Sequence, residues 1–327
     1  MTHPQRTHFA RLIATGSALP ERVVSNEELA TQFATSDKWI RDKIGIFERR
    51  YAADNQGVSD LATQAAQKAL AQAAMSATDL DAIILATATP EYSAPGSGVL
   101  VQNKLGCRTI PAFDVHNTSP GFLFSLDLAD GLLQSGRYQT LLVIGAEVHS
   151  RVLDFSDAGR MMSVIFGDGA GCVILQSHPA PIGLIDFVLH SDGQHFNKLW
   201  HPGKEAFGSP KDTTPQMDGR FVFENAVNCM TTAVQELLTR NKLKTDDIDL
   251  ALSHQANLRI IKAIQTQLQL TEAQVPHNIE RVGNTSSASI PILMDELMRA
   301  GTIKPGMQIV LMSFGSGFSW GAALLRT

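Results

Sequence analysis

The chain has 327 residues, of which 44% are hydrophobic and 18% charged, a composition too apolar for a disordered protein. At about 150 residues per domain, this length predicts two domains or one large two-part fold. The net charge of −5 is spread along the chain without blocks of one sign, which argues against nucleic acid as a partner. The three cysteines, at 107, 172 and 229, lack metal-ligand spacing, so we expect reduced thiols and no metal site.

The N-terminus has neither the charged start nor the apolar stretch of a signal peptide. No apolar run approaches the ~20 residues that a transmembrane helix needs. We therefore expect a cytoplasmic protein without a membrane span.

The first half of the chain alternates helical and strand patterns. Apolar residues at helical spacing from Leu61 to Ala73 lead to Asp81 and then to a buried-strand pattern, Ala-Ile-Ile-Leu-Ala. A strand over 110–115 precedes Asn117-Thr-Ser, which opens a helical stretch, and Leu-Leu-Val-Ile at 141–144 predicts the next strand.

The same order returns in the second half. Asp249 repeats Asp81 at an offset of 168 residues, and Asn284-Thr-Ser repeats Asn117-Thr-Ser at an offset of 167. Any α/β protein repeats such patterns loosely, but the constant offset and the shared tripeptide favour a duplication. The sequence predicts a duplicated α/β unit with mainly parallel strands and covering helices.

Three polar residues lie where ligands gather in such folds, at the carboxyl ends of strands. Ser119, His254 and Asn284 each occupy a strand-to-helix turn. A duplication would bring these turns to one pocket, as a candidate catalytic constellation. Taken singly, Ser119 suits a helix N-cap and His254 suits a structural role, so position alone leaves both interpretations open.

Two glycine-rich segments, 167–171 and 315–321, lead into strands. A dinucleotide-binding fingerprint needs a helix after its glycines, so neither segment fits. Both suit close backbone packing, and 315–317 also suits a turn whose N–H groups face an oxyanion. Trp39 suits either a core position or, beside Lys43, stacking on an adenine near phosphates. The remaining histidines lack the i, i+4 pairing of a metal site.

Several motifs together resemble the 3-oxoacyl-(acyl-carrier-protein) synthase III family of thiolase-like condensing enzymes. The resemblance covers nearly the whole length. Its motifs are Thr35-Ser-Asp-Lys-Trp-Ile, Gly45-Ile-Phe-Glu-Arg-Arg, Ile165-Phe-Gly-Asp-Gly-Ala-Gly, His254-Gln-Ala-Asn-Leu-Arg, Gly283-Asn-Thr-Ser-Ser-Ala-Ser-Ile-Pro and Phe314-Gly-Ser-Gly-Phe-Ser-Trp-Gly.

The resemblance implies a thiolase-like α/β fold, a duplicated five-layer αβαβα architecture with mixed, mainly parallel sheets, and a homodimer. We expect an N-terminal half over 1–176, carrying the nucleophile, and a C-terminal half over 177–327, carrying the histidine and the asparagine. His254 and Asn284 match the family's two decarboxylation residues. Phe314 matches a phenylalanine beside the malonyl group, and Ser316 stands where a glycine usually donates an oxyanion N–H.

The resemblance also implies a CoA site and an acyl pocket. Trp39 matches the residue that stacks on the adenine, and Lys43 stands where the family usually has arginine. Arg160, Asn257 and Arg259 complete the expected CoA entrance and carrier-protein surface. Ala94 lies nearest the position where acetyl-selective relatives carry phenylalanine, on a loop that reaches the partner's pocket in the family, so we expect a medium-chain primer.

Ser119 departs from the family because it occupies the position of the nucleophilic cysteine. A thiol at a helix N-terminus ionises readily, whereas a hydroxyl needs a general base, which His254 would have to supply. Two accounts fit: an engineered substitution in a protein whose natural residue is cysteine, or a natural member that uses serine. The otherwise complete set of motif residues favours the first.

The predicted function is decarboxylative condensation of an acyl-CoA primer with a malonyl thioester on acyl carrier protein, without a cofactor, in fatty acid or polyketide biosynthesis. One alternative is a serine-dependent acyltransferase that forms esters or amides without decarboxylation. Another is a catalytically silent subunit that binds acyl-CoA, for which the missing cysteine is the only argument.

Overall fold

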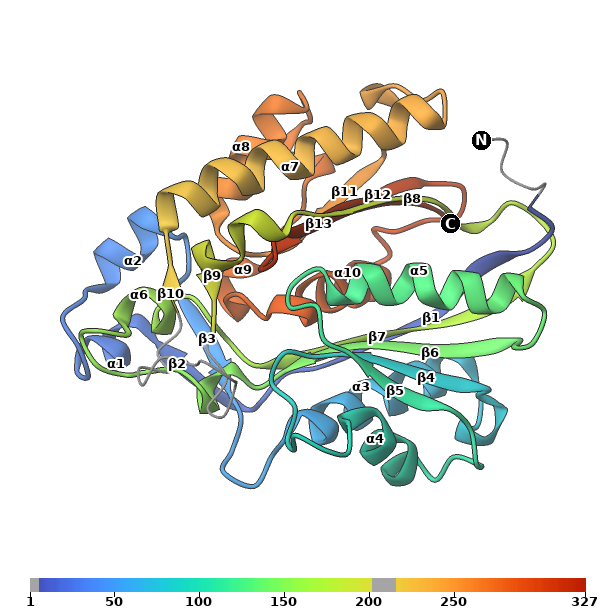
Figure 1. The fold of residues 1–327 in the computed structure, drawn as a ribbon, viewed down its shortest axis with the longest axis horizontal. Helices are drawn as coiled ribbons and strands as arrows, with labels where there is room; N and C mark the ends of the chain where they lie inside the picture. The colour runs from blue at the N-terminus through green and yellow to red at the C-terminus, as the bar shows by residue number, and fades with distance from the viewer. Residues whose placement is uncertain (1–5, 202–215) are drawn as a thin grey trace.

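The computed structural model describes residues 6–201 and 216–327 (Figure 1). Its main sheet has nine strands in the order β11-β12-β13-β8-β1-β7-β6-β4-β5. The strands of the first half are β1 (Phe9–Ala18), β4 (Ala82–Ala86), β5 (Ala112–Val115), β6 (Thr140–Glu147) and β7 (Gly169–His178). Those of the second half are β8 (Gly183–Ser191), β11 (Leu250–Ser253), β12 (Gln308–Gly315) and β13 (Ser319–Arg326).

The two halves of the sheet repeat one strand order. In the first half β4, β6, β7 and β1 are neighbours in that sequence, and in the second half β11, β12, β13 and β8 follow the same sequence. The directions also match, because the first pair of each series is parallel and the next two pairs are antiparallel. A single residue pair, Ala10–Leu184, joins the halves between β1 and β8. This arrangement is what a duplicated unit predicts.

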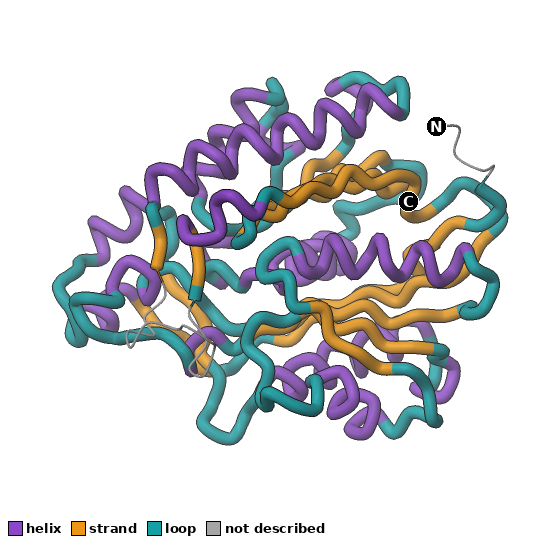
Figure 2. The backbone as a smooth tube through the Cα atoms, in the orientation of Figure 1, coloured by secondary structure: helices purple, strands orange, loops and turns teal. Residues whose placement is uncertain are grey.

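The helices complete five layers (Figures 1 and 2). The outer face of the first half is covered by α3 (Val58–Ala73) and α4 (Ser97–Leu105), and that of the second half by α7 (Gly219–Arg240) and α8 (Leu258–Gln267). The helices α5 (Gly121–Gln134) and α10 (Ser289–Arg299) lie between the two half-sheets. Each outer helical layer buries one apolar face against its half-sheet, and the central layer packs against both half-sheets, which produces three hydrophobic clusters.

The mixed sheet differs in one respect from the mainly parallel one that we expected. Parallel pairing is confined to β4–β5, β4–β6 and β11–β12, and the other ladders are antiparallel. The physical reason is the short connection from β12 to β13, which spans only 316–318 and must return the chain in the opposite direction. The expected division at residue 176 falls inside β7, two residues before its end.

Smaller elements extend one end of the molecule (Figure 1). They are β2 (Arg22–Ser25), α1 (Asn26–Ala30), α2 (Asp37–Lys43), β3 (Glu48–Tyr51), α6 (Arg160–Ser163), β9 (Leu199–Trp200), β10 (Gln216–Met217) and α9 (Ile279–Val282). Of the helices in 6–201 and 216–327, none combines the length and apolar character that crossing a bilayer requires.

Candidate active site

Ser119 lies in the turn that joins β5 to α5. The helix begins at Gly121 with Pro120 as its N-cap residue, and no backbone N–H of the helix bonds to the Ser119 hydroxyl. Ser119 is therefore not the helix cap that its position also allowed. Its Oγ instead lies 3.2 Å from Oγ of Ser286, in the equivalent turn of the second half.

Residues 284–289 form the centre of the site. A short 3₁₀ turn, Ser286–Ala288, leads directly into α10, and its three residues are buried. This turn packs tightly on β6, because a Cβ atom at Gly145 would lie 2.2 Å from the Ser287 carbonyl oxygen. Glycine at 145 thus allows the second half to approach the strand ends of the first.

Asn284 is held by its backbone and by its side-chain oxygen. Its N–H donates to the Ile165 carbonyl at 2.9 Å, and its carbonyl accepts from Gly167 N–H at 3.0 Å. The side-chain Oδ1 accepts the Ser286 N–H at 2.8 Å. The Nδ2 group makes no hydrogen bond with the described residues.

His254 follows directly after β11 and is 1% exposed. Its backbone N–H donates to the Met312 carbonyl at 2.8 Å, which extends the parallel ladder with β12. The ring Nδ1 lies 2.7 Å from Oγ of Ser289, the first residue of α10. Burial lowers the pKa of His254 to about 3, and the nearby His149 adds to the shift. The imidazole is therefore neutral at neutral pH.

The turn after β12 approaches Ser119 closely. A Cβ atom at Gly315 would lie 2.6 Å from Pro120 Cδ and 3.2 Å from Ser119 Cβ. Ser316 is the next residue of this turn, and its role as an oxyanion donor stays a prediction. Phe314 is buried, and its ring packs against that of Phe318 with centroids 4.7 Å apart.

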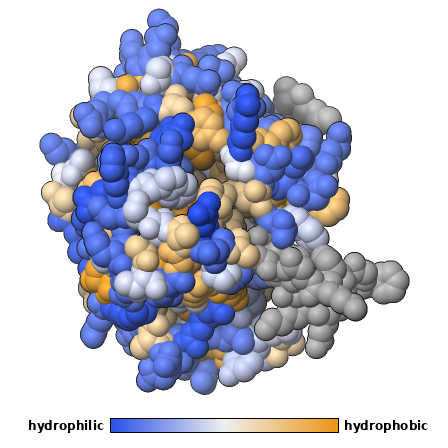
Figure 3. All heavy atoms as spheres, turned by 90° about the vertical axis from the view of Figure 1, so that its left-hand side faces the viewer, coloured by the Kyte–Doolittle hydropathy of each residue, from blue (hydrophilic) through white to orange (hydrophobic). Residues whose placement is uncertain are grey.

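The expected CoA residues lie on neighbouring elements around α2. Trp39 is half-buried on that helix and packs against the large cluster beneath α7. Lys43, at the end of α2, is exposed and its carbonyl accepts from the Asn257 side chain at 3.4 Å. Asn257 caps α8, its Oδ1 accepting the N–H of Arg259 at 2.8 Å. Figure 3 shows this end of the molecule, where apolar side chains are surrounded by polar ones.

Two arginines flank these residues. Arg259 is exposed, with its guanidinium 5.5 Å from the Phe223 ring centroid. Arg160 begins α6 and donates to the Ala34 carbonyl at 3.0 Å, just before α2. The structure thus places both cations on elements that adjoin α2, in agreement with their expected grouping.

Ala94 is exposed on the loop between β4 and α4. Asp114 of β5 anchors the end of this loop by accepting the N–H groups of Ser97 at 2.6 Å and Gly98 at 2.7 Å. The acyl-pocket role of Ala94 stays a prediction that requires a partner subunit.

A buried acidic network behind the site was not anticipated from the sequence. Glu147, at the end of β6, is fully buried and accepts from the Thr87, Thr89 and Ser287 hydroxyls and from the Ala88 N–H. Burial raises its pKa, and these hydrogen bonds oppose the shift. The one sequence feature that could have identified Glu147 is its position at the carboxyl end of a predicted strand.

His149 is a second histidine near His254 that the sequence reasoning missed. Its ring lies 4.3 Å from that of Phe166, which pairs with Asn284 through an isolated bridge. Burial lowers the pKa of His149 to about 4; Nε2 makes no hydrogen bond with the described residues, although it lies 3.9 Å from Oε2 of Glu147. His149 lies two residues after the end of β6, so its position beside a strand end was the only signal in the sequence.

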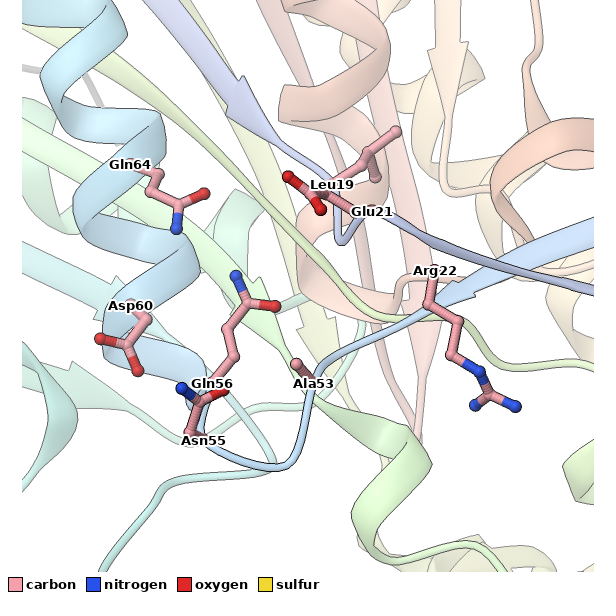
Figure 4. Close-up of a pocket in the computed structure, with 8 residues that line it drawn as sticks. All are labelled: Leu19, Glu21, Arg22, Ala53, Asn55, Gln56, Asp60 and Gln64. Atoms are coloured by element: carbon pink, nitrogen blue, oxygen red, sulfur yellow. The ribbon is translucent and has the colours of Figure 1, made fainter.

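A pocket of about 710 Å³ lies elsewhere, between the β1–β2 turn, the loop after β3 and the start of α3 (Figure 4). Its lining is mainly polar and contains none of the predicted site residues. The predicted residues Ser119, His254 and Asn284 meet instead at the 284–289 turn, which contains Asn284 and bonds to Ser119 through Ser286 and to His254 through Ser289.

Comparison with known proteins bears directly on this site. Family profiles described as 3-Oxoacyl-[acyl-carrier-protein (ACP)] synthase III and its C terminal match residues 113–193 and 238–327. A β-ketoacyl-[acyl-carrier-protein] synthase III of Methylococcus capsulatus is 42% identical over 322 residues, 98% of this chain and 99% of its own length. The chain belongs to the 3-oxoacyl-[acyl-carrier-protein] synthase III family.

Solved structures agree with that assignment. The 3-oxoacyl-[acyl-carrier-protein] synthase III of Aquifex aeolicus superposes with a TM-score of 0.92 at 37% identity, over 97% of this chain and 100% of that one. The priming β-ketosynthase of the R1128 polyketide pathway gives 0.91 at 31% identity, over 100% of this chain and 98% of that one. The predicted family and the thiolase-like α/β fold are confirmed.

Proposed function

We propose that this synthase III homologue joins an acyl-CoA primer to a malonyl thioester by decarboxylative Claisen condensation. Acyl carrier protein holds the malonyl group, no cofactor takes part, and the product serves fatty acid or polyketide biosynthesis. The observation that carries the proposal is the turn at 284–289, which bonds to Ser119 through Ser286 and to His254 through Ser289 and contains Asn284.

In the first stage residue 119 attacks the acyl thioester and takes the acyl group, while its proton passes to the CoA sulfur, which leaves as the free thiol. The expected oxyanion donors are the N–H groups of residues 119 and 316, which the close contact at Gly315 supports. The surface for CoA and carrier protein is provided by five residues: Trp39, Lys43, Arg160, Asn257 and Arg259. This grouping of exposed cations with a half-buried indole suits a phosphorylated adenine ligand.

In the second stage His254 and Asn284 hold the thioester oxygen of the malonyl group. Because Ser286 engages Oδ1 of Asn284, the amide presents N–H donors toward the substrate. Loss of carbon dioxide leaves an enolate, which two donors stabilise by about 3 kcal/mol each. The enolate carbon then attacks the acyl group on residue 119, beside Phe314.

Acylation of Ser119 is the step of this mechanism that the structure supports least. Among the described residues its hydroxyl contacts only Ser286, and no hydrogen bond to His254 activates it. A serine hydroxyl stays protonated without a base, so we expect slow acylation in this chain. The competing serine-dependent acyltransfer would need that base, and it would leave Asn284 without a purpose. A catalytically silent subunit that binds acyl-CoA would need neither His254 nor Asn284.

The edge of the sheet supports a homodimer. β5 is the outermost strand of the first half, and Phe113 on this strand is 39% exposed. Tyr92 and Val99, in the loop and helix anchored to β5, are also exposed. Pairing of two β5 edges would cover these side chains and bring the Ala94 loop to the partner.

Carbon dioxide release from malonyl-carrier protein tests the proposal without requiring Ser119. We expect measurable release from this chain and its loss in His254→Ala and Asn284→Asp, because Asp has no N–H to donate and adds negative charge beside an enolate. His190→Ala, which removes a half-exposed histidine bonded to Glu236, should retain release. Unchanged release in either site variant would contradict the assigned roles.

A further inference from the structure

Three groups surround the Ser289 hydroxyl. Its Oγ donates to the Ser286 carbonyl at 2.9 Å, accepts from Gln255 N–H at 3.3 Å and lies 2.7 Å from His254 Nδ1. Ser289 and His254 are both 1% exposed. The hydroxyl has a single proton, so its direction determines whether Nδ1 donates or accepts.

Counting protons favours one arrangement. A carbonyl oxygen can only accept and a backbone N–H can only donate, so Oγ satisfies all three neighbours only when its proton points to Ser286. Nδ1 must then carry a proton and donate to Oγ. If the hydroxyl proton points to Nδ1 instead, its hydrogen bond to the Ser286 carbonyl is lost. That carbonyl still accepts a hydrogen bond from the Ser289 backbone N–H.

We infer that Ser289 is a positioning residue that holds His254 of the free protein as the Nδ1–H tautomer, with Nε2 unprotonated toward the site. This inference deepens the proposed function and rests on it for the meaning of Nε2. An unprotonated Nε2 accepts a proton, as activation of residue 119 requires. It does not donate to a thioester oxygen.

The second stage needs the other tautomer. A substrate carbonyl oxygen only accepts, so its binding selects the Nε2–H form, and the Ser289 proton turns from the Ser286 carbonyl to Nδ1. Because the backbone N–H of Ser289 still donates to that carbonyl, reorienting the hydroxyl proton costs little free energy. Ser289 thereby allows one histidine to take the proton of residue 119 and pass it to the departing CoA sulfur in the first stage, and, neutral again, to donate a hydrogen bond in the second.

Nitrogen NMR of ¹⁵N-histidine-labelled full-length protein tests the assignment independently of catalysis, with the His254 signals identified by their absence in His254→Ala. We expect protonated Nδ1 and unprotonated Nε2 in the free protein. Ser289→Ala should move the proton to Nε2, because a buried N–H without an acceptor is less tolerable than a free acceptor. Ser289→Thr should restore the original form. Ser125→Ala, which removes another buried serine hydroxyl on α5, should leave the tautomer unchanged.

The outcomes separate this inference from the proposed function. An Nε2–H form in the free protein, an unchanged tautomer in folded Ser289→Ala, or a failure of folded Ser289→Thr to restore Nδ1–H would overturn the role of Ser289. Carbon dioxide release from malonyl-carrier protein should disappear in His254→Ala and persist in Ser125→Ala. Absence of release from the unmodified protein, together with the expected tautomers, would reject the proposed function and leave the Ser289 assignment standing.

Discussion

The hydroxyl oxygens of Ser119 and Ser286 lie 3.2 Å apart, although the two residues are separated by 167 positions in the chain. Each is the last residue of an Asn-Thr-Ser tripeptide at the start of an inner helix. The contact therefore joins equivalent turns of the two halves, and the duplication itself assembles the site from the ends of β5 and β11 and from the turn before α10.

Replacement of Ser119 by cysteine should increase condensation by orders of magnitude. A thiol near a helix N-terminus reaches its nucleophilic anion at far lower cost than a hydroxyl. The measurement is turnover with acyl-CoA and malonyl-carrier protein, with carbon dioxide release as the control, since that step does not use residue 119. A fall in turnover in Ser119→Cys would identify serine as the working nucleophile.

Much of this arrangement could be predicted from local patterns. Alternation of apolar runs identified β4, β6, β11 and β12, and the shared tripeptide identified the equivalent turns. The order of β13 and β8 within the sheet could not be predicted, because antiparallel pairing there depends on which distant strand edges meet and no local pattern encodes that choice.

The contacts that hold the proposed catalytic residues also could not be predicted from the sequence. Ser286 and Ser289 look like ordinary helix-start serines, and their partners Ser119 and His254 lie far away in the chain. Glu147 ends a buried strand and His149 follows it, and neither belongs to a recognisable motif. Such contacts depend on tertiary packing, in particular the close approach at Gly145.

Acid should destabilise this protein partly through His149 and His254. Both are neutral when folded, with pKa values lowered to about 4 and about 3, whereas an unfolded histidine titrates near 6.5. Between pH 6.5 and about 4 the unfolded state binds the additional protons. Each histidine then lowers the free energy of unfolding by up to about 1.4 kcal/mol per pH unit, and above pH 6.5 this effect vanishes.

Urea unfolding across pH isolates the contribution of His149. The carboxyl of Asp130, whose pKa burial raises to about 6, acts in the opposite direction over part of this range. It is common to the parent and to His149→Leu, so it cancels in their difference. The dependence of stability on pH should be shallower in His149→Leu between pH 6 and 4.5, and parallel curves would contradict a buried neutral His149.

A charge at the β5 edge should separate the proposed dimer. Phe113→Arg would place a cation where two edge strands are expected to pair, and burying it without a partner is costly. Sedimentation of the purified protein should show a dimer for the parent chain and a monomer for this variant. Val23→Arg, on the separate β2–β3 ribbon at 41% exposure, is the matched control. A monomeric parent, or a Phe113→Arg variant that stays dimeric, would contradict the proposed interface.

We predict a medium-chain acyl primer, because Ala94, a small residue, lies on the loop predicted to form the floor of the acyl pocket. In the dimer the loop carrying Ala94 is expected to reach the partner's site, and Ala94 leaves space that a longer apolar chain can fill. Each additional buried methylene contributes roughly 0.8 kcal/mol. The affinity for acyl-CoA, measured along a two- to ten-carbon series, should therefore increase with chain length until the space is filled. Ala94→Phe should abolish the gain while acetyl-CoA still binds, and Ser93→Ala, which adds no bulk beside it, should preserve the gain. Affinity that is flat or falling along the series in the parent protein would reject this account of the acyl pocket.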